Sequence, residues 1–375
     1  ESLTREEKQE FARAFASQDV LNYNIDLMTL AVSVRLSKAG GIAFSHRMRY
    51  STRLDMNKNM AEILFLGKEA PIYKQFPVND TVIGIASVFG GTAIKAAWLN
   101  EWNIAYGNRI IDLAGLKLNA GIGYKYIEGI GVVDVDIRDG RAEAYVSVSP
   151  IFDIDYSLYV NDPQFNYRRR DSGLQPVGKG HGFDIGASAE IGENIRVGAS
   201  VTDIGNITWT GNLLEARDQR LVQVESEGVS SYELAEEIAR FIANSKDSLL
   251  TYTAGAERKE NLPAKFRTGV GYKVNKRYEV GLDVTVPLNE APGNLAKTFV
   301  GVGVDVRVLE YLRLSSGIST GAGYGTNLPL GATVVFPVYE FGIATRDITG
   351  FFINKHPHNS IAFGFLRFKF GKAGS

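Results

Sequence analysis

The sequence predicts an all-β chain that forms a transmembrane antiparallel β-barrel of about 14 strands, with short helices in its outer loops. Three observations predict this fold. Aliphatic residues alternate with small or charged residues over many segments, and the connections between these segments alternate in length. In addition, no stretch of the sequence approaches 18 uncharged apolar residues, so no helix is predicted to span a membrane.

The alternation is clearest between Arg277 and Val308. Side chains of a β-strand point to opposite faces with a period of two residues, so each segment here presents one aliphatic face and one small or charged face. This pattern, repeated over about a dozen segments, favours a barrel whose aliphatic face meets lipid and whose polar face lines the lumen. The aliphatic set is Tyr278, Val280, Leu282, Val284, Val286, Val300, Val302, Val304, Val306 and Val308.

Thirteen segments are predicted as strands, and many approach the 9–11 residues that a tilted strand needs to cross a membrane. They are Asn22–Val34, Gly41–Arg53, Ala97–Ile110, Gly115–Tyr126, Gly182–Ile191, Ile195–Asp203, Ala264–Lys273, Arg277–Val286, Thr298–Val308, Tyr311–Ser319, Leu328–Phe336, Val338–Arg346 and His358–Phe370.

The connections between the strands predict the topology. Outer-membrane barrels have short periplasmic turns and longer outer loops, so the first predicted strand descends toward the periplasm and the thirteenth descends as well. An even strand count therefore predicts one further ascending strand, either ahead of Glu1, as an N-terminal strand with a plug, or within Ile127–His181, if that outer excursion contains two crossings. The single domain 1–375 would consist of an outer-loop helix within residues 1–20, over Ser2–Ala16, followed by barrel strands and loops over 21–370.

The long loops carry predicted structure of their own. Asp139-Gly140 is a type I′ hairpin signal between Asp134–Ile137 and Arg141–Val148. Ser230 and Glu233 form a capping box that predicts a helix over Tyr232–Asn244. Aromatic residues at strand ends predict an interfacial girdle: Tyr272, Tyr278, Phe336 and Tyr339.

Composition excludes several classes of function. The 375 residues carry a net charge of −1, so no strong field recruits nucleic acid, and the absence of Cys excludes disulfides and thiolate metal sites. Only four His residues occur, without a catalytic partner that can be recognised, so we expect no enzyme, cofactor or metal.

Two groups of residues could be considered as metal sites, but each has a simpler explanation. His356-Pro357-His358 is better explained as a loop tip than as a metal site. Exposed hairpin charges explain Asp134, Asp136 and Asp139, and also Asp153 and Asp155, better than a calcium site does, because the EF-hand pattern is absent. His46, on the aliphatic face of its strand, indicates either a partner-facing groove or a slip of the predicted register.

Charged residues on the inward face predict a polar lumen. The simpler interpretation is a salt-bridged filling that keeps the barrel in shape, and the functional one is a polar pathway or a wall against which a plug docks. Glycines on the same face make room for a plug, loops or a ligand. The predicted network contains Arg47, Arg49, Glu279, Asp283, Asp305, Arg307, Arg313, Glu340 and Arg346.

Several segments resemble an uncharacterised family of outer-membrane barrels from Bacteroidota. They are Gly40–Arg49, Glu62–Gly67, Ser149–Tyr156, Gly178–Asp184, Val201–Gly205 with Trp209, and Pro287–Asn294. That family is distantly similar to FadL, the long-chain fatty-acid transporter barrel, and to the barrel subunit of the type IX secretion translocon. The resemblance implies 14 strands, an outer-membrane location and an additional N-terminal segment, and it implies no reaction.

Two functions follow as alternatives. One is a FadL-like conduit for small hydrophobic molecules, which requires an apolar pocket near Phe15, Phe65 or Phe241. The other is a structural or accessory subunit of a multi-protein outer-membrane complex, with a plugged lumen. The expected partners are outer-membrane lipids and lipopolysaccharide, together with hydrophobic small molecules or other outer-membrane proteins.

Overall fold

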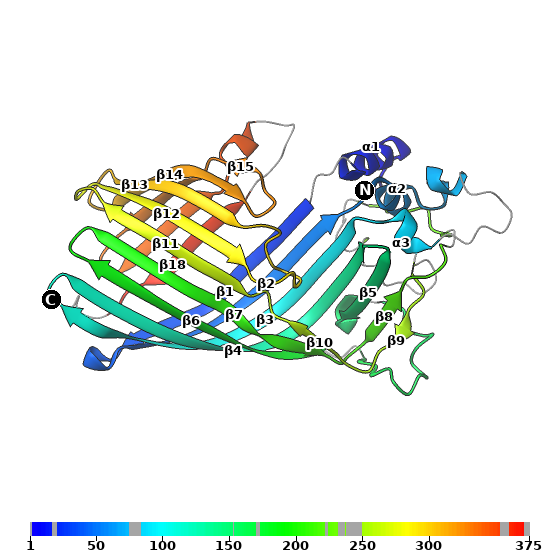
Figure 1. Cartoon of the computed structure of the whole chain (residues 1–375), viewed down its shortest axis with the longest axis horizontal. Helices are drawn as coiled ribbons and strands as arrows, with labels where there is room; N and C mark the ends of the chain where they lie inside the picture. Colours follow the sequence, from blue (N-terminus) through cyan, green and yellow to red (C-terminus); the bar gives the residue numbers. More distant parts are fainter. Residues whose placement is uncertain are drawn as a thin grey trace.

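The molecule is elongated, with a β-barrel wall at one end and a cap that carries the helices at the other (Figure 1). The computed structural model describes residues 2–16, 21–74, 84–152, 154–169, 173–221, 224–231, 237, 250–352 and 360–370. These residues form one sheet of 18 strands with few helices. Among them, no helix is long and apolar enough to cross a membrane.

The wall contains all thirteen predicted strands, and each pairs antiparallel with the next. Two short strands, β10 and β15, continue the lines of β11 and β16. The bounds are β1 (Leu21–Arg35), β2 (Gly41–Asp55), β3 (Thr92–Leu113), β4 (Leu116–Arg138), β6 (Gly178–Ile191), β7 (Ile195–Trp209), β10 (Arg258–Asn261), β11 (Lys265–Lys273), β12 (Tyr278–Pro287), β13 (Phe299–Arg307), β14 (Leu312–Gly321), β15 (Thr326–Asn327), β16 (Leu330–Val335), β17 (Tyr339–Thr345) and β18 (Ile361–Phe368).

The two edges of the wall are β1 and β18. Within the described ranges, β1 pairs only with β2 and β18 pairs only with β17. Since β18 is the thirteenth strand of an alternating series, it runs in the same direction as β1. These two edges therefore cannot pair antiparallel with each other, and the further strand that the sequence predicts stays a prediction.

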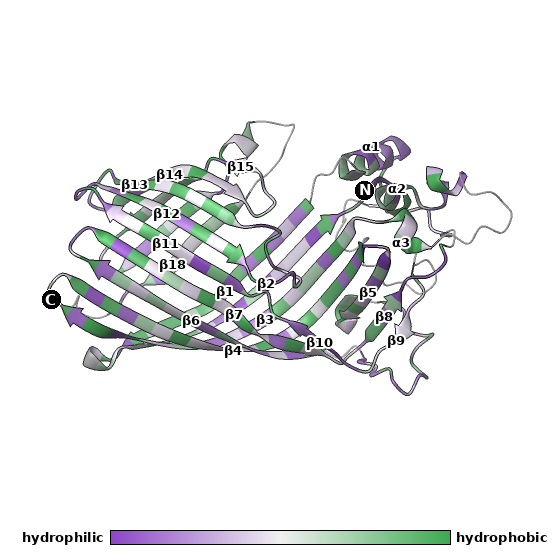
Figure 2. Ribbon diagram, viewed as in Figure 1, coloured by the Kyte–Doolittle hydropathy of each residue, from purple (hydrophilic) through white to green (hydrophobic). Residues whose placement is uncertain are grey.

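The two faces of the wall have the predicted chemistry. The cross-strand pairs Val280–Val304 and Leu282–Val302 continue the aliphatic ladder, and Val280, Leu282 and Val302 are exposed on the outer surface. Striped hydropathy along the wall strands is visible in Figure 2. Tyr311 and Phe336 stack with ring centroids 5.9 Å apart at the end with short turns, as the aromatic girdle predicts. This arrangement is that of an outer-membrane β-barrel.

Strand β4 passes from the wall into the cap. It pairs with β6 as far as Gly129 and with β5 (Arg141–Val148) from Gly131 onward. The predicted hairpin at Asp139-Gly140 joins β4 to β5, and both residues have the positive φ of a type I′ turn, 53° and 72°. Strands β8 (Leu213–Arg217) and β9 (Thr253–Ala254) extend this cap sheet.

The helices gather on the cap. They are α1 (Arg5–Ala16), α2 (Lys58–Leu66) and α3 (Ile85–Val88), with 3₁₀ turns at Gly67–Glu69, Pro71–Lys74 and Pro150–Phe152. Two further 3₁₀ turns lie in wall connections, Ser37–Ala39 between β1 and β2 and Thr349–Phe351 between β17 and β18. Helix α1 confirms the predicted N-terminal helix, and Thr4 and Glu7 form its capping box: the Glu7 N–H donates to Thr4 Oγ1 at 3.3 Å, and the Thr4 N–H to Glu7 Oε2 at 2.8 Å. The helix predicted over Tyr232–Asn244 lies almost wholly outside the described residues.

Helix α2 was not predicted, although its start signal is readable. The side chain of Asn57 caps it by accepting a hydrogen bond from the Met60 N–H at 2.9 Å. It ends at Gly67, whose φ of 54° and contact with Ser226 exclude a side chain, since a Cβ would lie 2.0 Å from the Ser226 carbonyl oxygen. This packing fixes α2 against the 224–231 segment.

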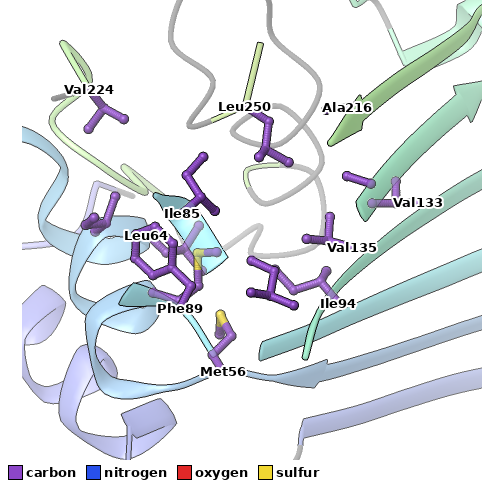
Figure 3. Close-up of a cluster of buried hydrophobic side chains, with 14 of the residues drawn as sticks. Met56, Leu64, Ile85, Phe89, Ile94, Val133, Val135, Ala216, Val224 and Leu250 are labelled. Carbon is purple, nitrogen blue, oxygen red and sulfur yellow. The ribbon is translucent and has the colours of Figure 1, made fainter. Parts of the chain in front are cut away.

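The cap encloses an apolar core (Figure 3). Side chains from the three helices and from the upper parts of β3, β4, β5 and β8 meet in it, and Phe65, Phe89 and Ile85 are completely buried. Phe11 of α1 stacks on Phe65 of α2 with centroids 5.6 Å apart. Burial of such aliphatic and aromatic surface is the main force that holds the helices onto the β-extension.

Candidate functional site: the barrel lumen

The lower part of the lumen is a wide chamber of about 1410 Å³. Its walls alternate between glycines or serines, which leave space, and a few charged side chains. Glu279 lies 3.5 Å from Arg196, and Asp305 accepts a hydrogen bond from Ser315 at 2.8 Å. The inward residues that line it include Gly121, Gly123, Asp184, Gly186, Ser188, Gly198, Ser200, Gly269, Gly271, Asp283 and Gly303.

Above this chamber, a set of ion pairs crosses the lumen. We call it the ion-pair belt. Its members are Asp26, Arg47, Arg49, Glu101, Lys125, Asp184 and Asp203.

The belt links strands that are far apart around the wall. Arg49 on β2 contacts Asp203 on β7 at 3.1 Å, although β3, β4 and β6 lie between these strands along the wall. Four strand spacings amount to about 19 Å around the circumference. The two side chains therefore meet across the interior rather than along the wall.

Within the described part of the chain, five of the seven belt ions have two charged partners each, and Asp26 and Asp184 have one. Arg47 contacts Glu101 at 2.6 Å and Asp26 at 3.4 Å. The other oxygen of Glu101 contacts Arg49, and Lys125 binds Asp203 at 2.6 Å and Asp184 at 2.8 Å. Glu101, Lys125 and Asp203 are buried. Because a buried charge that loses its partner is costly, the belt is a connected unit rather than a set of independent pairs.

Asp203 has an unusual backbone that aims its carboxylate into the belt. It lies at an irregularity in the β6–β7 pairing and has a φ of 60°, a conformation that L-residues rarely adopt. Its N–H donates to Asp184 Oδ1 at 2.8 Å. Strain of this kind persists only where the surroundings hold it, and here the two cations Arg49 and Lys125 do so.

A loop folds inward above the belt. We call residues 288–298, between β12 and β13, the plug loop. Asn294 Nδ2 donates to the Ala264 carbonyl at 3.0 Å, and Asn289 Nδ2 donates to the Leu262 carbonyl at 2.7 Å. At the loop tip, Gly293 has a φ of 87° and approaches Ser51 on β2 so closely that a Cβ would lie 2.8 Å from its Oγ. The loop thus spans from β11 and β12 to the opposite wall.

The plug loop is also tied to the cap. Glu290 contacts Arg138 at 2.7 Å, and its carbonyl accepts a hydrogen bond from Lys95 Nζ at 3.1 Å. Lys95 contacts Asp134 at 3.5 Å, in the part of β4 that pairs with β5 above the wall. Burial raises the pKa of Asp134 to about 6, against the opposing effect of Lys95. The Asp136 pKa is lowered by its hydrogen bond from Arg138.

The remaining members of the predicted network lie away from the belt. Glu340 contacts Lys369 at 2.7 Å and Arg367 at 3.1 Å, near the short turns. Arg346 lies over the Tyr324 ring, 4.1 Å from its centroid. Arg307 and Arg313 are paired across β13 and β14, and Asp283 faces the lower chamber. Of the predicted set, only Arg47 and Arg49 belong to the belt.

Sequence reasoning missed Asp26, Glu101, Asp184 and Asp203 of the belt, and also Lys265, a β11 residue that contacts the plug loop. Glu101 lies two residues from Asn103 on the inward face of β3, so the alternation of that strand could have identified it. The inward orientation of Asp203 could not be predicted from alternation, because the pairing of β6 with β7 is irregular between Phe183 and Ile185.

The aromatic residues expected to form an apolar pocket are packed instead. Phe65 is completely buried in the cap core, and Phe15 lies against it with centroids 5.1 Å apart. Neither residue lines the lumen chamber of about 1410 Å³ or three smaller hollows of about 200–580 Å³ in the described part of the molecule. Phe241 lies outside the described residues.

The histidines have ordinary surroundings, but the prediction of exposed hairpin charges is wrong for two of its three aspartates. Asp139 is exposed, whereas Asp134 and Asp136 are largely covered and contact Lys95, because the hairpin packs into the cap. His46 faces outward, with Nδ1 2.6 Å from Thr29 Oγ1 and its ring 4.1 Å from that of Trp102, and its strand is in the predicted register. His356 and His358 lie outside the described residues, as does Asp153. Among the residues that are described, no group of three or more His, Cys, Asp or Glu could hold a metal ion.

Comparisons with known proteins found one sequence family and several solved structures of low similarity. A sequence family of unknown function, DUF5723, matches residues 1–345. No curated protein matches the chain. Among solved structures, the toluene transporter TbuX of Ralstonia pickettii is 11% identical, with 87% of this chain and 82% of that chain covered and a TM-score of 0.37.

Two further structures are similar at the same low level. The toluene transporter TodX of Pseudomonas putida is 8% identical, with 88% and 83% of the two chains covered and a TM-score of 0.39. Outer membrane phospholipase A of Escherichia coli is 8% identical, with 86% and 87% covered and a TM-score of 0.28. The expected links to Bacteroidota and to type IX secretion stay predictions.

Proposed function

Because this chain belongs to DUF5723, a family of unknown function, we propose a role from the geometry of its lumen: it is a gated outer-membrane conduit for small polar solutes. The observation that carries the proposal is the wide chamber of about 1410 Å³ that ends at the ion-pair belt. A barrel that needed its interior only for stability could fill it with large side chains. Here glycines and serines keep the space clear.

The lining argues for a polar solute rather than the hydrophobic molecule expected from the FadL resemblance. Charged groups such as Arg196, Glu279 and Asp283 face the chamber, and the apolar surface expected at Phe65 is consumed by the cap core. A hydrophobic solute would have to displace water from these charges without replacing their hydrogen bonds, which is unfavourable.

The gate would consist of the belt and the plug loop. Both cross the lumen, and both consist of polar contacts rather than of a packed apolar core. The neutral hydrogen bonds of the plug loop can be exchanged for water at a modest net cost, since such a bond contributes only about 0.5–1.5 kcal/mol. Separation of the buried pair Arg49–Asp203 costs more, unless water or an ionic solute takes the place of the lost partner. Opening would require the loop tip to leave Ser51 and the pair Arg49–Asp203 to separate.

Conductance across a planar lipid bilayer tests this proposal. The full chain should conduct weakly, and replacement of residues 290–295 by a Gly-Ser linker of equal length should raise the conductance several-fold. Asp203→Asn in the same background should raise it further. The matched control is Asp139→Asn, at an exposed hairpin tip outside the lumen. Unchanged low conductance in folded loop and belt variants would contradict the proposal.

A second candidate is a non-transporting subunit of an outer-membrane assembly. The specific observation that favours it is the packed cap above the plug loop, whose core would have to move away for an open axial path. Such a subunit would keep low conductance in every variant and would be recovered with defined partner proteins when the intact chain is purified from native membranes.

A further inference from the structure

We propose that a small hollow between the belt and the plug loop is a binding site for a small oxyanion, such as phosphate or a carboxylate. The hollow measures about 200 Å³. One water takes up about 30 Å³ of liquid, so this space can hold such an ion with part of its hydration shell. Its lining comes from β1, β2 and β11, from the plug loop and from Tyr324 and Arg346.

Charge is the first argument. Of the described residues that line the hollow, six are cationic and one, Asp26, is a carboxylate. The cations are Arg47, Arg49, Arg53, Lys265, Arg267 and Arg346. Some of them are already neutralised: Arg47 and Arg49 belong to the belt, and Arg53 contacts Asp55 at 3.2 Å.

Lys265 and Arg267 are not neutralised in this way. Neither has a carboxylate within 4 Å in the part of the chain that the structure describes. Lys265 is only 7% exposed, and its Nζ donates to a carbonyl, that of Gly293 in the plug loop, at 3.3 Å. Asp203, on the neighbouring strand β7, already binds Arg49 and Lys125. A buried ammonium beside an unneutralised guanidinium favours an anion between them.

Donor groups are the second and independent argument. Asn22 Nδ2 and Arg53 Nε are buried, and neither has a hydrogen-bond partner among the residues that the structure describes. Both residues line the same hollow, from β1 and β2. Buried polar groups are almost always satisfied, so donors gathered around one space point to an acceptor that occupies it. An oxyanion is an acceptor only, and it satisfies several N–H donors at once.

The location gives the site a role in the conduit. Arg267 lines both this hollow and the lower chamber, so a bound oxyanion would sit at the upper end of the chamber. The site itself is independent of transport. Only its use as the position that selects anions rests on the proposed function.

Binding of inorganic phosphate to the purified full chain in detergent tests the site, with acetate as the carboxylate probe. Titrations are done at constant ionic strength, because surface attraction is screened by salt and a specific site is screened less. We expect saturable binding of at least one probe, seen by calorimetry and as an increase in Tm. The stronger probe identifies the kind of oxyanion.

Variants separate this site from general charge effects. Lys265→Gln and Arg267→Gln should each weaken binding at least tenfold, whereas Lys265→Arg should largely retain it. The control is Arg196→Gln, which removes a lumen cation that does not line the hollow, and it should bind as the original chain does. The heat-modifiable migration of a folded barrel in gel electrophoresis verifies that each variant is folded.

The outcomes differ from those of the conductance experiment. Absence of saturable binding of both probes, or equal binding by Lys265→Gln and the original chain, overturns the site. If Lys265→Gln does not fold, then Lys265→Arg and Arg267→Gln decide the question. Saturable binding in a chain that never conducts would retain the site and reject the conduit.

Discussion

The cap and the barrel wall are formed by the same sheet, but its apolar face points inward in the cap and outward in the wall. Strand β4 belongs to both: its lower half, paired with β6, has Ile122 exposed on the outside and Gly123 against the lumen. Its upper half, paired with β5, buries Val133 and Val135 in the cap core. A single strand can therefore bury its apolar side chains in lipid along one half and in a protein core along the other. The wall is apolar outside and polar inside, whereas the cap is apolar inside.

The two regions should therefore respond differently to the same kind of substitution. The cap should lose stability when an apolar core side chain is truncated. The wall should lose stability when its outer face acquires a charge, and should tolerate a charge on its inner face.

The largest expected effect is in the cap. Phe65→Ala removes a completely buried ring that stacks on Phe11 and contacts Phe15, so we expect a loss of about 3–5 kcal/mol. Amide hydrogen exchange should show loss of protection in α2 and β5 while the wall strands stay protected. The matched control is Phe183→Ala on the exposed outer face of the wall, which should leave the cap protected. Equal loss in wall and cap would show that the two regions unfold as one unit.

The next effect is on the outer face of the wall. Val302→Arg places a charge on the aliphatic face, where Val302 is 52% exposed, and should destabilise the barrel by roughly 2–4 kcal/mol in lipid. Gly301→Arg is the matched control, because Gly301 lies on the inner face opposite Asp283. Equilibrium unfolding in phospholipid vesicles measures both. If the two variants are equally stable, the assignment of the faces is wrong.

The smallest expected effect is electrostatic and belongs to the cap. The pKa of Asp134 is raised from 3.8 to about 6 by burial, so the folded cap holds this proton more tightly than the unfolded chain does. The stabilisation is complete below about pH 4, near the ordinary pKa of the group, and is lost as the pH rises to about 6. The displacement corresponds to roughly 2–3 kcal/mol.

Asp134→Asn should remove this pH dependence. Exchange protection of β5, measured from pH 4 to pH 7, should decline less in the variant than in the original chain. Asp139→Asn, at the exposed tip of the same hairpin, serves as the control and should leave the decline unchanged. An unaltered pH dependence in Asp134→Asn would mean that Asp134 is not the group responsible.

The wall strands and their two faces could be predicted from the sequence, because alternation with a period of two residues is a local property. The segments Arg277–Val286 and Thr298–Val308 became β12 and β13, with Val280 opposite Val304 as the ladder requires. The hairpin at Asp139-Gly140 and the N-terminal helix were readable for the same reason, since turn and capping signals lie within a few residues.

What fills the lumen and what closes the cap could not be predicted, because both depend on contacts between residues that are far apart in the sequence. Arg49 and Asp203 are 154 residues apart in the chain, and they meet because the wall curves until β2 and β7 face each other across the interior. No local pattern encodes that curvature, and the irregular pairing of β6 with β7 interrupts the parity that would have placed Asp203. Phe65 likewise could not be assigned to a packed core or to an open pocket from its sequence neighbours, because α1 and the upper part of the sheet, which are distant in sequence, cover it.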